Sequence, residues 1–497
     1  MTTADFYYLM PLVILSAAAI VIMLVIAVYR DHRTTFILTL VGFAAALIST
    51  FIISPLHTRE IGGLLIADNY AAFYWGLIFA ASFSITLMSY SYFRHQEEEK
   101  EEYYMLLLTA TLGSGILVVS KHFISFFMGL EILSVSLYAL VSYLPERQRC
   151  IEAGIKYLVL AAASSAFLLF GMALVYAESG TMDFMRLGAH IASVNAATPV
   201  MLAGFSMMVI AVGFKLALAP FHMWTPDVYE GAPAPVTAFV ATVSKGGMFA
   251  LWFRFFLMIN GYRFNSLVLL FTIIAIASMF IGNFLALMQN NVKRILAYSS
   301  IANLGYLLVA FLAGGIMGVE AATFYLVAYI ITTLGTFGIV TVLSDKYRDA
   351  DNIEDYRGLF WRRPFIATVF TAMLFSLAGI PLTAGFIGKF YLVAAAINSS
   401  LWLPVVILVI NSAISVYYYL KIVVAMYRQP EEVPEAEVSL SGGITYPALS
   451  VGGGIVLAVL TVFLVWFGTY PAGMIDLIRT MVAGISNVSV TMHSVIP

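Results

Sequence analysis

The sequence predicts an all-α, polytopic membrane protein with about fourteen transmembrane helices. The first observation is composition, since 62% of the 497 residues are hydrophobic and only 10% are charged. A soluble domain carries about 25% charged residues, so a water-soluble fold could not bury this much apolar surface. The second observation is that the apolar residues fall into repeated runs of membrane-spanning length. The third is that proline interrupts two of these runs next to a lysine.

A bilayer core about 30 Å thick needs about 20 apolar residues per helix. The first run, 11–28, lacks a preceding basic region and a small-residue cleavage site, which indicates a transmembrane helix rather than a removed signal. The predicted spans lie near 9–28, 35–53, 71–93, 104–120, 123–143, 153–177, 200–220, 235–258, 266–288, 295–314, 318–343, 365–397, 402–426 and 449–469.

The basic residues of the loops are unequally divided between the two sides of the membrane. One side collects 14 of them: Arg30, Arg33, Arg94, Lys100, Arg147, Arg149, Lys293, Arg294, Lys346, Arg348, Arg357, Arg362, Arg363 and Arg428. The other side has 6: Arg59, Lys121, Arg186, Arg254, Arg263 and Arg479. Cytoplasmic loops are enriched in Lys and Arg, so we expect the first side to face the cytoplasm. Both termini then lie on the opposite, periplasmic side.

Six further charged residues fall inside apolar runs: Glu131, Lys156, Lys215, Lys245, Lys389 and Lys421. A charge at the bilayer centre costs at least ~2.5–3.5 kcal/mol, so such residues are rarely incidental. Lys421 is near the end of its span, where a long side chain reaches the interface, and Lys156 is open to either interpretation. For the other four we favour function over a structural ion pair, because three lysines and one acid do not balance.

These charges suit proton transfer. Burial favours the neutral form of a lysine, and a nearby carboxylate favours the charged form. A change in the position of Glu131 relative to Lys215 would therefore switch the lysine between holding and losing its proton. His222 is interpreted either as a relay between Lys215 and Lys245 or as an ordinary loop histidine, with a slight preference for the relay.

Pro220 interrupts the seventh predicted span just after Lys215, and Pro381 interrupts the twelfth just before Lys389. Proline removes a backbone donor and frees carbonyl groups, which at membrane depth must face protein or water. Broken helices in corresponding positions of two halves indicate a transport path between inverted repeats. A packing kink explains one such proline, but two breaks beside buried charges favour a functional role.

Two polar stripes follow helical spacing. Ser299, Asn303 and Tyr306 share one helix face, and Tyr325, Tyr329, Thr332 and Thr336 share a face of the next span. Interhelical hydrogen bonding and a hydrated channel explain these stripes equally well.

The sequence contains no pattern for a redox centre or a nucleotide. Its single cysteine, Cys150, cannot hold an iron–sulfur cluster alone, and no glycine-rich phosphate loop is present. The net charge of −2 argues against a nucleic-acid partner. We therefore expect no cofactor or metal on this chain, and lipid as its main solvent.

Three segments resemble the antiporter-like subunits of respiratory complex I. They are Pro220-Phe-His-Met-Trp-Thr-Pro-Asp-Val-Tyr-Glu-Gly-Ala-Pro-Ala-Pro-Val, followed by Ser244-Lys245; Lys293-Arg-Ile-Leu-Ala-Tyr-Ser-Ser-Ile-Ala-Asn-Leu-Gly-Tyr; and Gly385-Phe-Ile-Gly-Lys-Phe-Tyr. The first and last are most similar to the subunit N branch of bacterial NADH:quinone oxidoreductases, and the similarity covers nearly the whole chain. The resemblance implies an N-terminal three-helix segment (1–103), two inverted five-helix repeats (104–260 and 261–430), and a final segment (431–497) with a loop, the last transmembrane helix and a tail.

The resemblance also implies a proton path through the membrane midplane. The family's charged residues of helices 5, 7, 8 and 12 fall on Glu131, Lys215, Lys245 and Lys389, and a lysine of helix 6 falls on Lys156. Quinone reduction in neighbouring subunits would drive this path, with FMN, iron–sulfur clusters and quinone bound there. Subunit M and small membrane subunits such as K would be partners, in a bacterial inner membrane.

Three alternatives remain open from the sequence. One is a subunit of a multi-subunit monovalent-cation/proton antiporter, which would exchange sodium without NADH oxidation. A second is a passive structural subunit whose lysines brace the bundle. A third is a related photosynthetic-type complex that uses ferredoxin, which the motifs fit less well.

Overall fold

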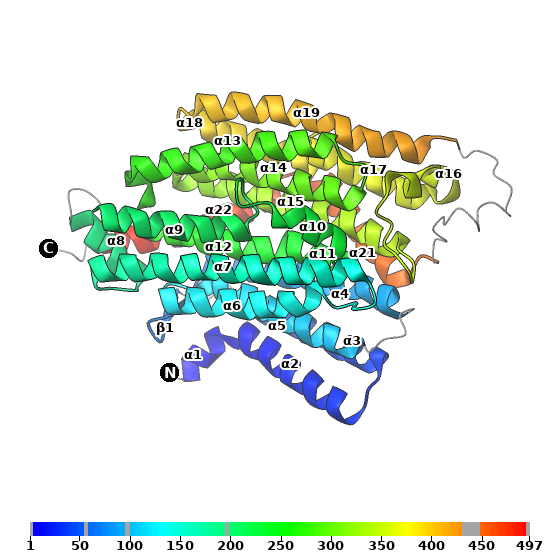
Figure 1. Ribbon diagram of the computed structural model, residues 1–497. Helices are drawn as coiled ribbons and strands as arrows, with labels where there is room; N and C mark the ends of the chain where they lie inside the picture. Colours follow the sequence, from blue (N-terminus) through cyan, green and yellow to red (C-terminus); the bar gives the residue numbers. More distant parts are fainter. Residues whose placement is uncertain (1–2, 54–57, 95–99, 194–197, 430–447, 494–497) are drawn as a thin grey trace.

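The computed structural model describes residues 3–53, 58–94, 100–193, 198–429 and 448–493, with side chains described up to 483. Within these ranges the chain is a bundle of helices that lie side by side and roughly parallel (Figure 1). Twelve helices are long and apolar enough to span a membrane. Three shorter helices form the seventh and twelfth predicted spans, so all fourteen predicted spans are helical: α9 (Pro199–Lys215), α17 (Pro364–Ala378) and α18 (Ala384–Asn398).

The N-terminal part of the bundle has three long helices and a small hairpin. Its elements are α1 (Thr3–Tyr8), α2 (Met10–Val28), α3 (His32–Ile53), β1 (Arg59–Ile61), β2 (Leu65–Ala67) and α4 (Asn69–Arg94). Strands β1 and β2 pair antiparallel and are the single departure from the all-α expectation in the described ranges. Helix α2 is hydrophobic throughout, and half of its surface faces outward, as expected of a helix in contact with lipid.

The next part contains the first broken span. Its elements are α5 (Glu101–Val119), α6 (Phe123–Val141), α7 (Gln148–Ser179), α8 (Phe184–Ser193), α9 (Pro199–Lys215), α10 (Trp224–Gly231), α11 (Ala234–Phe239), the π-helical segment η1 (Val240–Ser244) and α12 (Lys245–Met258). Helices α11, η1 and α12 form one continuous, buried span. The predicted boundary 103/104 falls inside α5, so it does not mark a break in the chain.

The remaining elements include two helices with a completely buried stretch of 18 residues, α14 and α15. They are η2 (Gly261–Arg263), α13 (Asn265–Leu287), α14 (Val292–Ala313), α15 (Gly315–Leu343), η3 (Ile353–Tyr356), α16 (Leu359–Arg362), α17 (Pro364–Ala378), α18 (Ala384–Asn398), α19 (Trp402–Tyr427), α21 (Val451–Thr469) and α22 (Ala472–His493). Helix α22, which packs against α4 and α15, lies where the sequence predicts only a tail. The predicted boundary 430/431 lies outside the described residues.

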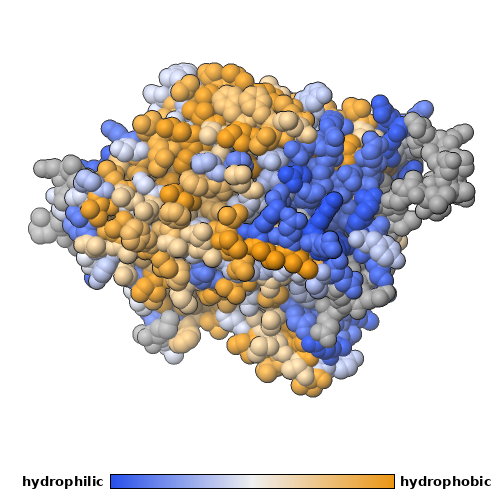
Figure 2. Space-filling view, in the orientation of Figure 1, coloured by the Kyte–Doolittle hydropathy of each residue, from blue (hydrophilic) through white to orange (hydrophobic). Residues whose placement is uncertain are grey.

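The surface separates into apolar and polar zones. Figure 2 shows apolar residues over most of the visible face and hydrophilic residues gathered at one end. Figure 1 shows α1, which begins at Thr3, towards the other end of the bundle. A hydrophilic area also extends over α10 towards the middle of the face, where charged residues of α7, α10 and α14 line a cleft. This cleft brings polar surface close to the first helix break.

Candidate functional site

Glu131 lies in the middle of α6 and is half-buried. Its carboxylate accepts a hydrogen bond of 2.6 Å from the Ser165 hydroxyl on α7. No ion pair within 4.0 Å joins Glu131 to a basic group in the described part of the chain. One helical turn further along α6, Ser134 contacts Lys215. Glu131 therefore lies near Lys215 but does not contact it directly.

Lys215 is the last residue of α9 and is only 3% exposed. Its ammonium group donates to the Ser134 hydroxyl at 2.7 Å and to the Tyr157 hydroxyl at 3.2 Å. The same nitrogen lies 5.2 Å from the centre of the Tyr157 ring, within the range of a cation–π interaction. Neutral groups of α6 and α7 therefore supply the contacts of this buried cation.

The chain leaves helical geometry directly after Lys215. Ala217 has a positive φ of 58°, and Pro220 carries no backbone donor that could continue the helix. The Trp224 indole of α10 donates to the carbonyl of Phe214 at 2.8 Å, and this carbonyl also accepts from the Ala217 amide at 3.0 Å. The Ser278 hydroxyl accepts from the Ala219 amide at 2.9 Å. Side chains thus satisfy backbone groups that the break exposes, as burial in a membrane requires.

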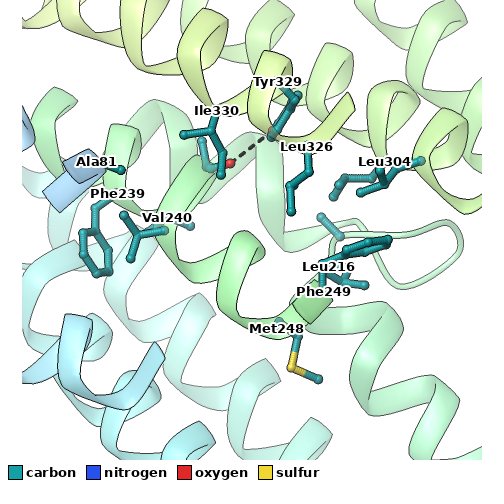
Figure 3. Close-up of a cluster of buried hydrophobic side chains, with 14 of the residues drawn as sticks. Ala81, Leu216, Phe239, Val240, Met248, Phe249, Leu304, Leu326, Tyr329 and Ile330 are labelled. Carbon is teal, nitrogen blue, oxygen red and sulfur yellow. Dashed lines mark hydrogen bonds between the residues drawn. The ribbon is translucent and has the colours of Figure 1, made fainter. Parts of the chain in front are cut away.

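Lys245 begins α12 directly after the π-helical segment, and its side chain is fully buried. It donates to Ser300 of α14 at 2.5 Å, and Ser300 is 2.6 Å from the hydroxyl of Tyr329 on α15. Tyr329 donates in turn to the Ala241 carbonyl of the π-helical segment at 3.1 Å, the bond drawn in Figure 3. Figure 3 shows apolar side chains of α11, α12, α14 and α15 around this contact, so the polar group lies in a dry environment.

The predicted polar stripe of α14 continues from Ser300 towards the second half of the bundle. Ser299 is hydrogen-bonded to the Tyr419 hydroxyl of α19, and the Asn303 amide donates to Ser299 at 3.1 Å. The Tyr325 hydroxyl donates to Asn303 at 2.7 Å. Interhelical hydrogen bonds therefore account for this stripe. The hydroxyls of Thr332 and Thr336 on α15 bond instead to carbonyls of their own helix.

A narrow space between α14, α15 and the end of α17 extends this polar layer. Its empty volume is about 170 Å³, but it is too narrow for a water molecule. It is lined by Leu296, Ser299, Ser300, Tyr329, Thr333, Thr336, Phe337 and Leu377. It thus adjoins the Ser300 partner of Lys245 and also Leu377, whose carbonyl contacts Lys389.

Lys389 lies in α18 just after the second break and is 7% exposed. It donates to the carbonyls of Leu377 and Ala378 at 2.9 and 3.0 Å, and to the Ser412 hydroxyl at 2.9 Å. Its ammonium lies 5.0 Å from the centre of the Tyr306 ring. Gly379 ends α17 with φ 85°, and a Cβ there would lie 2.9 Å from the Lys389 side chain. Glycine therefore permits both the turn and the close approach.

Lys156 lies apart from this buried layer. Its side chain is 43% exposed and pairs with Asp227 of α10 at 2.8 Å and with Glu152 of α7 at 2.7 Å. The three residues line the cleft over α10, which has a volume of about 180 Å³. The full lining is Arg149, Glu152, Ala153, Lys156, Asp227, Glu230, Gly231 and Arg294.

The two remaining candidates lie in loops or near a span end. His222 is buried between α9 and α10, and no hydrogen bond joins it to Lys215 or Lys245 in the described structure. Its role as a relay stays a prediction. Lys421 donates to the carbonyl of Gln289 at 3.0 Å and to the side chain of Asn290 at 2.7 Å, both just beyond the end of α13. This agrees with an interfacial position.

Other buried cations have carboxylate partners. Lys121 pairs with Glu60 at 2.5 Å, Arg254 with Asp68 at 2.7 Å, and Lys293 with Asp349 at 2.8 Å. The sequence analysis was wrong to place Arg254 in a loop, because it lies within α12 and is buried. Asp68 meets its guanidinium with two hydrogen bonds of 2.7 and 2.8 Å, which offsets the cost of burial.

Lys215, Lys245 and Lys389 differ from these paired cations. Within the described ranges, no carboxylate lies within 4.0 Å of their ammonium groups. Each instead has a neutral hydroxyl partner and an aromatic ring. A buried lysine without a counter-ion can lose its proton and remain stable, whereas a paired one is held in the charged form. The three lysines thus share chemistry suited to proton exchange.

The sequence analysis did not single out Trp224, Tyr229, Asp227 and Glu230, all on α10. They lie in the Pro220–Val236 motif that carries the family resemblance. The sequence analysis assigned the residues of this motif to a helix break and did not predict a helix within it. Alternation of aromatic and acidic residues over eight positions is a signal for a short helix with one buried and one charged side.

Comparisons with known proteins agree with this fold and site. The profile described as NADH:quinone oxidoreductase/Mrp antiporter, TM matches residues 120–415. The NADH-quinone oxidoreductase subunit N of Nitrosospira multiformis is 48% identical over 97% of both chains. That of Ectopseudomonas mendocina is 44% identical over 95% of both chains. A chain of respiratory complex I from Thermus thermophilus, solved with bound aureothin, is 28% identical with a TM-score of 0.80, covering 94% of this chain and 98% of that one.

A chain of the Mrp complex from a Dietzia species has a TM-score of 0.83 at 19% identity, with 97% of both chains covered, and this likeness concerns the fold alone. Fold, broken helices and buried lysines define an antiporter-like, proton-translocating membrane subunit. More specifically, the chain belongs to the family of NADH-quinone oxidoreductase subunit N.

Proposed function

We propose that Lys215, Lys245 and Lys389 carry protons across the membrane and that Glu131 controls when Lys215 holds its proton. The observation that supports this is that buried cations fall into two groups, those with neutral partners and those with carboxylate partners. Lysines in the central layer have only neutral partners, while Lys293 and Arg254 are neutralised by acids. A purely structural lysine would be expected to have a counter-ion, because breaking a buried pair leaves a costly charge.

In the proposed sequence, a proton from the cytoplasmic side reaches Lys215 or Lys245 near the first helix break. It then passes through the polar side chains of α14 to Lys389 and leaves on the periplasmic side. The bonds from Lys245 to Ser300 and Tyr329 support the first part of this route. The hydrogen bonds form separate groups, so transfer between them requires side-chain movement or water. A change at Glu131, coupled to the neighbouring subunit, would start the transfer.

The energy for this transfer would come from NADH:quinone oxidoreductase as a whole. Moving one proton against the membrane potential costs about 2.3 kcal/mol per 100 mV. We propose that FMN, iron–sulfur clusters and quinone are bound by partner subunits, and that this chain contacts subunit M and small membrane subunits such as K. The naming of its relatives as subunits of this oxidoreductase supports that assignment.

We further propose a location in a bacterial inner membrane with both termini in the periplasm. The unequal division of basic residues between the loops of the two sides supports this orientation. Protease digestion of a C-terminal tag in spheroplasts tests it. Digestion is expected from the outside, and full protection of the tag there would reverse the orientation.

We also propose that 104–260 and 261–430 are inverted repeats. Each contains a broken span with a buried lysine, but Lys215 precedes its break and Lys389 follows its break. An inverted relation reverses the direction of equivalent helices across the membrane but keeps their order along the chain, so the two lysines lie beside equivalent breaks without being equivalent residues.

Replacement of Lys215 by alanine tests the proposed carrier role. NADH:quinone activity and proton pumping are measured in membrane vesicles after assembly of the complex has been confirmed. We expect both to fall sharply. Lys421→Ala is the matched control, because that lysine bonds to neutral groups at a span end. If Lys215→Ala assembles and both activities match those of the control, Lys215 is structural and the route is wrong.

The antiporter alternative shares the fold, as the Mrp complex shows. It predicts sodium-dependent proton exchange in vesicles that contain the protein but have no NADH. The identity to subunit N proteins over nearly the whole chain favours the oxidoreductase.

A further inference from the structure

Helix α10 separates the two lysines of the first half from the charged cleft. Its inner side carries Trp224, whose ring centre is 5.0 Å from that of Tyr157, and Tyr229, whose ring lies 5.4 Å from the Lys245 ammonium. Trp224 and Tyr229 are 6.5 Å apart. Since Tyr157 also contacts Lys215, three aromatic rings form a continuous series between Lys215 and Lys245.

The outer side of α10 carries acids that pair with two neighbouring helices. Asp227 accepts from Lys156 of α7 at 2.8 Å and from Arg294 of α14 at 3.0 Å. Glu230 accepts from Arg294 at 2.7 Å and from Arg149 of α7 at 3.3 Å. These five side chains line the cleft visible as the hydrophilic area over α10 in Figure 2. Each acid therefore links α10 to both α7 and α14.

The C-terminal end of α10 is held by backbone contacts. Lys293 donates to the carbonyls of Glu230 and Ala232 at 3.0 and 2.6 Å, and the Cys150 thiol donates to the Gly231 carbonyl at 2.9 Å. A Cβ at Gly231 would come within 2.5 Å of the Arg149 carbonyl. Helix α10 thus packs directly on α7 at the position of Cys150, and Cys150 is buried as a result.

We propose that Asp227 and Glu230 are positioning residues, which through Lys156, Arg149 and Arg294 fix α10 so that Trp224 and Tyr229 screen Lys215 from Lys245. This inference rests on the proposed roles of those two lysines as carriers. An eight-residue helix has little stability alone, and the break at Pro220 removes the support of a continuous helix. The position of α10 therefore depends on its contacts with α7 and α14, to which the side chains of Asp227 and Glu230 contribute.

This assignment gives Lys156 a role other than carrying protons. Its ammonium has two carboxylate partners, and its side chain faces the cleft rather than Lys215. It acts on the buried lysines through α10. Release of the Asp227 contacts would let the aromatic rings move and open a connection between Lys215 and Lys245.

Alkylation of Cys150 by N-ethylmaleimide in the assembled complex measures the position of α10 directly. Cys150 is the single cysteine of the chain, so mass spectrometry of its peptide identifies the modification. In Asp227→Asn the shape of the side chain is kept and its charge is lost. We expect alkylation to become about tenfold faster, since loss of hydrogen bonds to charged groups increases local opening. Coupled proton pumping per NADH is expected to fall in the same variant.

Glu152→Gln is the matched control, because Glu152 pairs with Lys156 on the same helix and makes no described contact with α10. Its alkylation rate and pumping should equal those of the unmodified protein, and Asp227→Glu should restore both towards the original values. The proposed role of Asp227 would be wrong if Asp227→Asn left the alkylation rate unchanged, or if Glu152→Gln accelerated alkylation equally. This result is independent of the effect of Lys215→Ala on pumping.

Trp224→Leu tests the screen without disturbing the ion pairs. We expect pumping per NADH to fall while the Cys150 alkylation rate stays unchanged. If Asp227→Asn fails to assemble, this variant still tests whether the aromatic rings separate Lys215 from Lys245. An assembled Trp224→Leu complex with normal pumping would show that the rings do not separate the two lysines and would refute the proposal.

Discussion

Lys215 and Lys389 each lie beside a helix break, one in each half of the chain, but their partners differ in kind. Lys215 contacts two hydroxyl groups, from Ser134 and Tyr157. Lys389 contacts two backbone carbonyls at the end of α17 and one hydroxyl, from Ser412. An acid, Glu131, lies on the helix that supplies Ser134, and no described acid has a comparable place beside Lys389.

This difference in partners affects which protonation state of the lysine each site can hydrogen-bond. A hydroxyl both donates and accepts, so Tyr157 can serve either protonation state of Lys215, while the Ser134 hydroxyl accepts from Lys215 and donates to the Leu130 carbonyl at 2.5 Å. A carbonyl only accepts, and the carbonyls at a helix C-terminus also carry partial negative charge, which favours a protonated lysine. Lys215 therefore has surroundings suited to switching by a nearby acid, whereas the two carbonyls beside Lys389 can only accept hydrogen bonds from it.

Lys215 and Lys389 can act in sequence only while the two halves keep a fixed relation, and Asp349 joins the halves. Its carboxylate accepts from Tyr92 and Arg147 of the first half at 2.7 and 2.9 Å, and from Lys293 of the second at 2.8 Å. Asp349→Asn leaves two cations without their acid, so we expect the free energy of unfolding to fall by about 3–5 kcal/mol. Thermal dissociation of the purified complex on native gels measures the loss.

The same residue predicts a dependence on pH. Burial raises the pKa of Asp349, but Lys293 and Arg147 outweigh burial and hold the pKa at about 2, below the ordinary 3.8. Its contribution to stability is therefore fully present above pH 3.8 and is lost as the pH falls towards 2. The stability of Asp349→Asn should not show this loss between pH 3.8 and 2. If the stability of both proteins fell equally over this pH range, the role of Asp349 would be contradicted.

Glu131→Gln removes the acid that distinguishes the first half. The amide keeps the size of the side chain and can still accept from Ser165, so packing should be preserved. We expect coupled turnover to fall about tenfold, the effect of a coupling free energy of about 1.4 kcal/mol between two sites. NADH-driven proton uptake in vesicles measures it. Normal proton uptake in an assembled Glu131→Gln complex would mean that Glu131 does not control Lys215, and that the acid does not distinguish Lys215 from Lys389.

Ser134→Ala removes one of the two hydroxyl partners of Lys215. A hydrogen bond to a charged group contributes about 1.5–3 kcal/mol, and Tyr157 retains part of this stabilisation, so we expect pumping to slow about fourfold. The measurement is the rate of proton pumping at fixed NADH. Ser136→Ala on the same helix is the control, because its hydroxyl bonds to Thr109 and to the Ile132 carbonyl instead.

Ser412→Ala is the corresponding change at Lys389 and should have the smallest effect. The carbonyls of Leu377 and Ala378 remain in place, so we expect pumping to slow less than about twofold. A loss equal to that in Ser134→Ala would mean that hydroxyl groups matter equally at both lysines and that the carbonyls do not substitute for them.

Much of the fold could be predicted from the sequence, because a bilayer imposes simple conditions on single helices. Apolar length decided which segments span, and all fourteen predicted segments are helical. Pro220 and Pro381 located the two breaks, since proline cannot continue a helix. The hairpin β1–β2 and helix α22 escaped prediction, because short polar or mixed segments carry no comparable signal.

The sequence by itself determined that Glu131, Lys215, Lys245 and Lys389 lie inside spans, since composition and span length suffice for that, but it missed Arg254. Only the tertiary structure decided which of them have a counter-ion. Asp68 and Arg254 are 186 positions apart in the chain, and Lys293 and Asp349 are 56 apart. Partners at such distances depend on how helices pack, and packing separates the neutralised cations from Lys215, Lys245 and Lys389. The same dependence places Lys156 in the charged cleft, where it contacts α10.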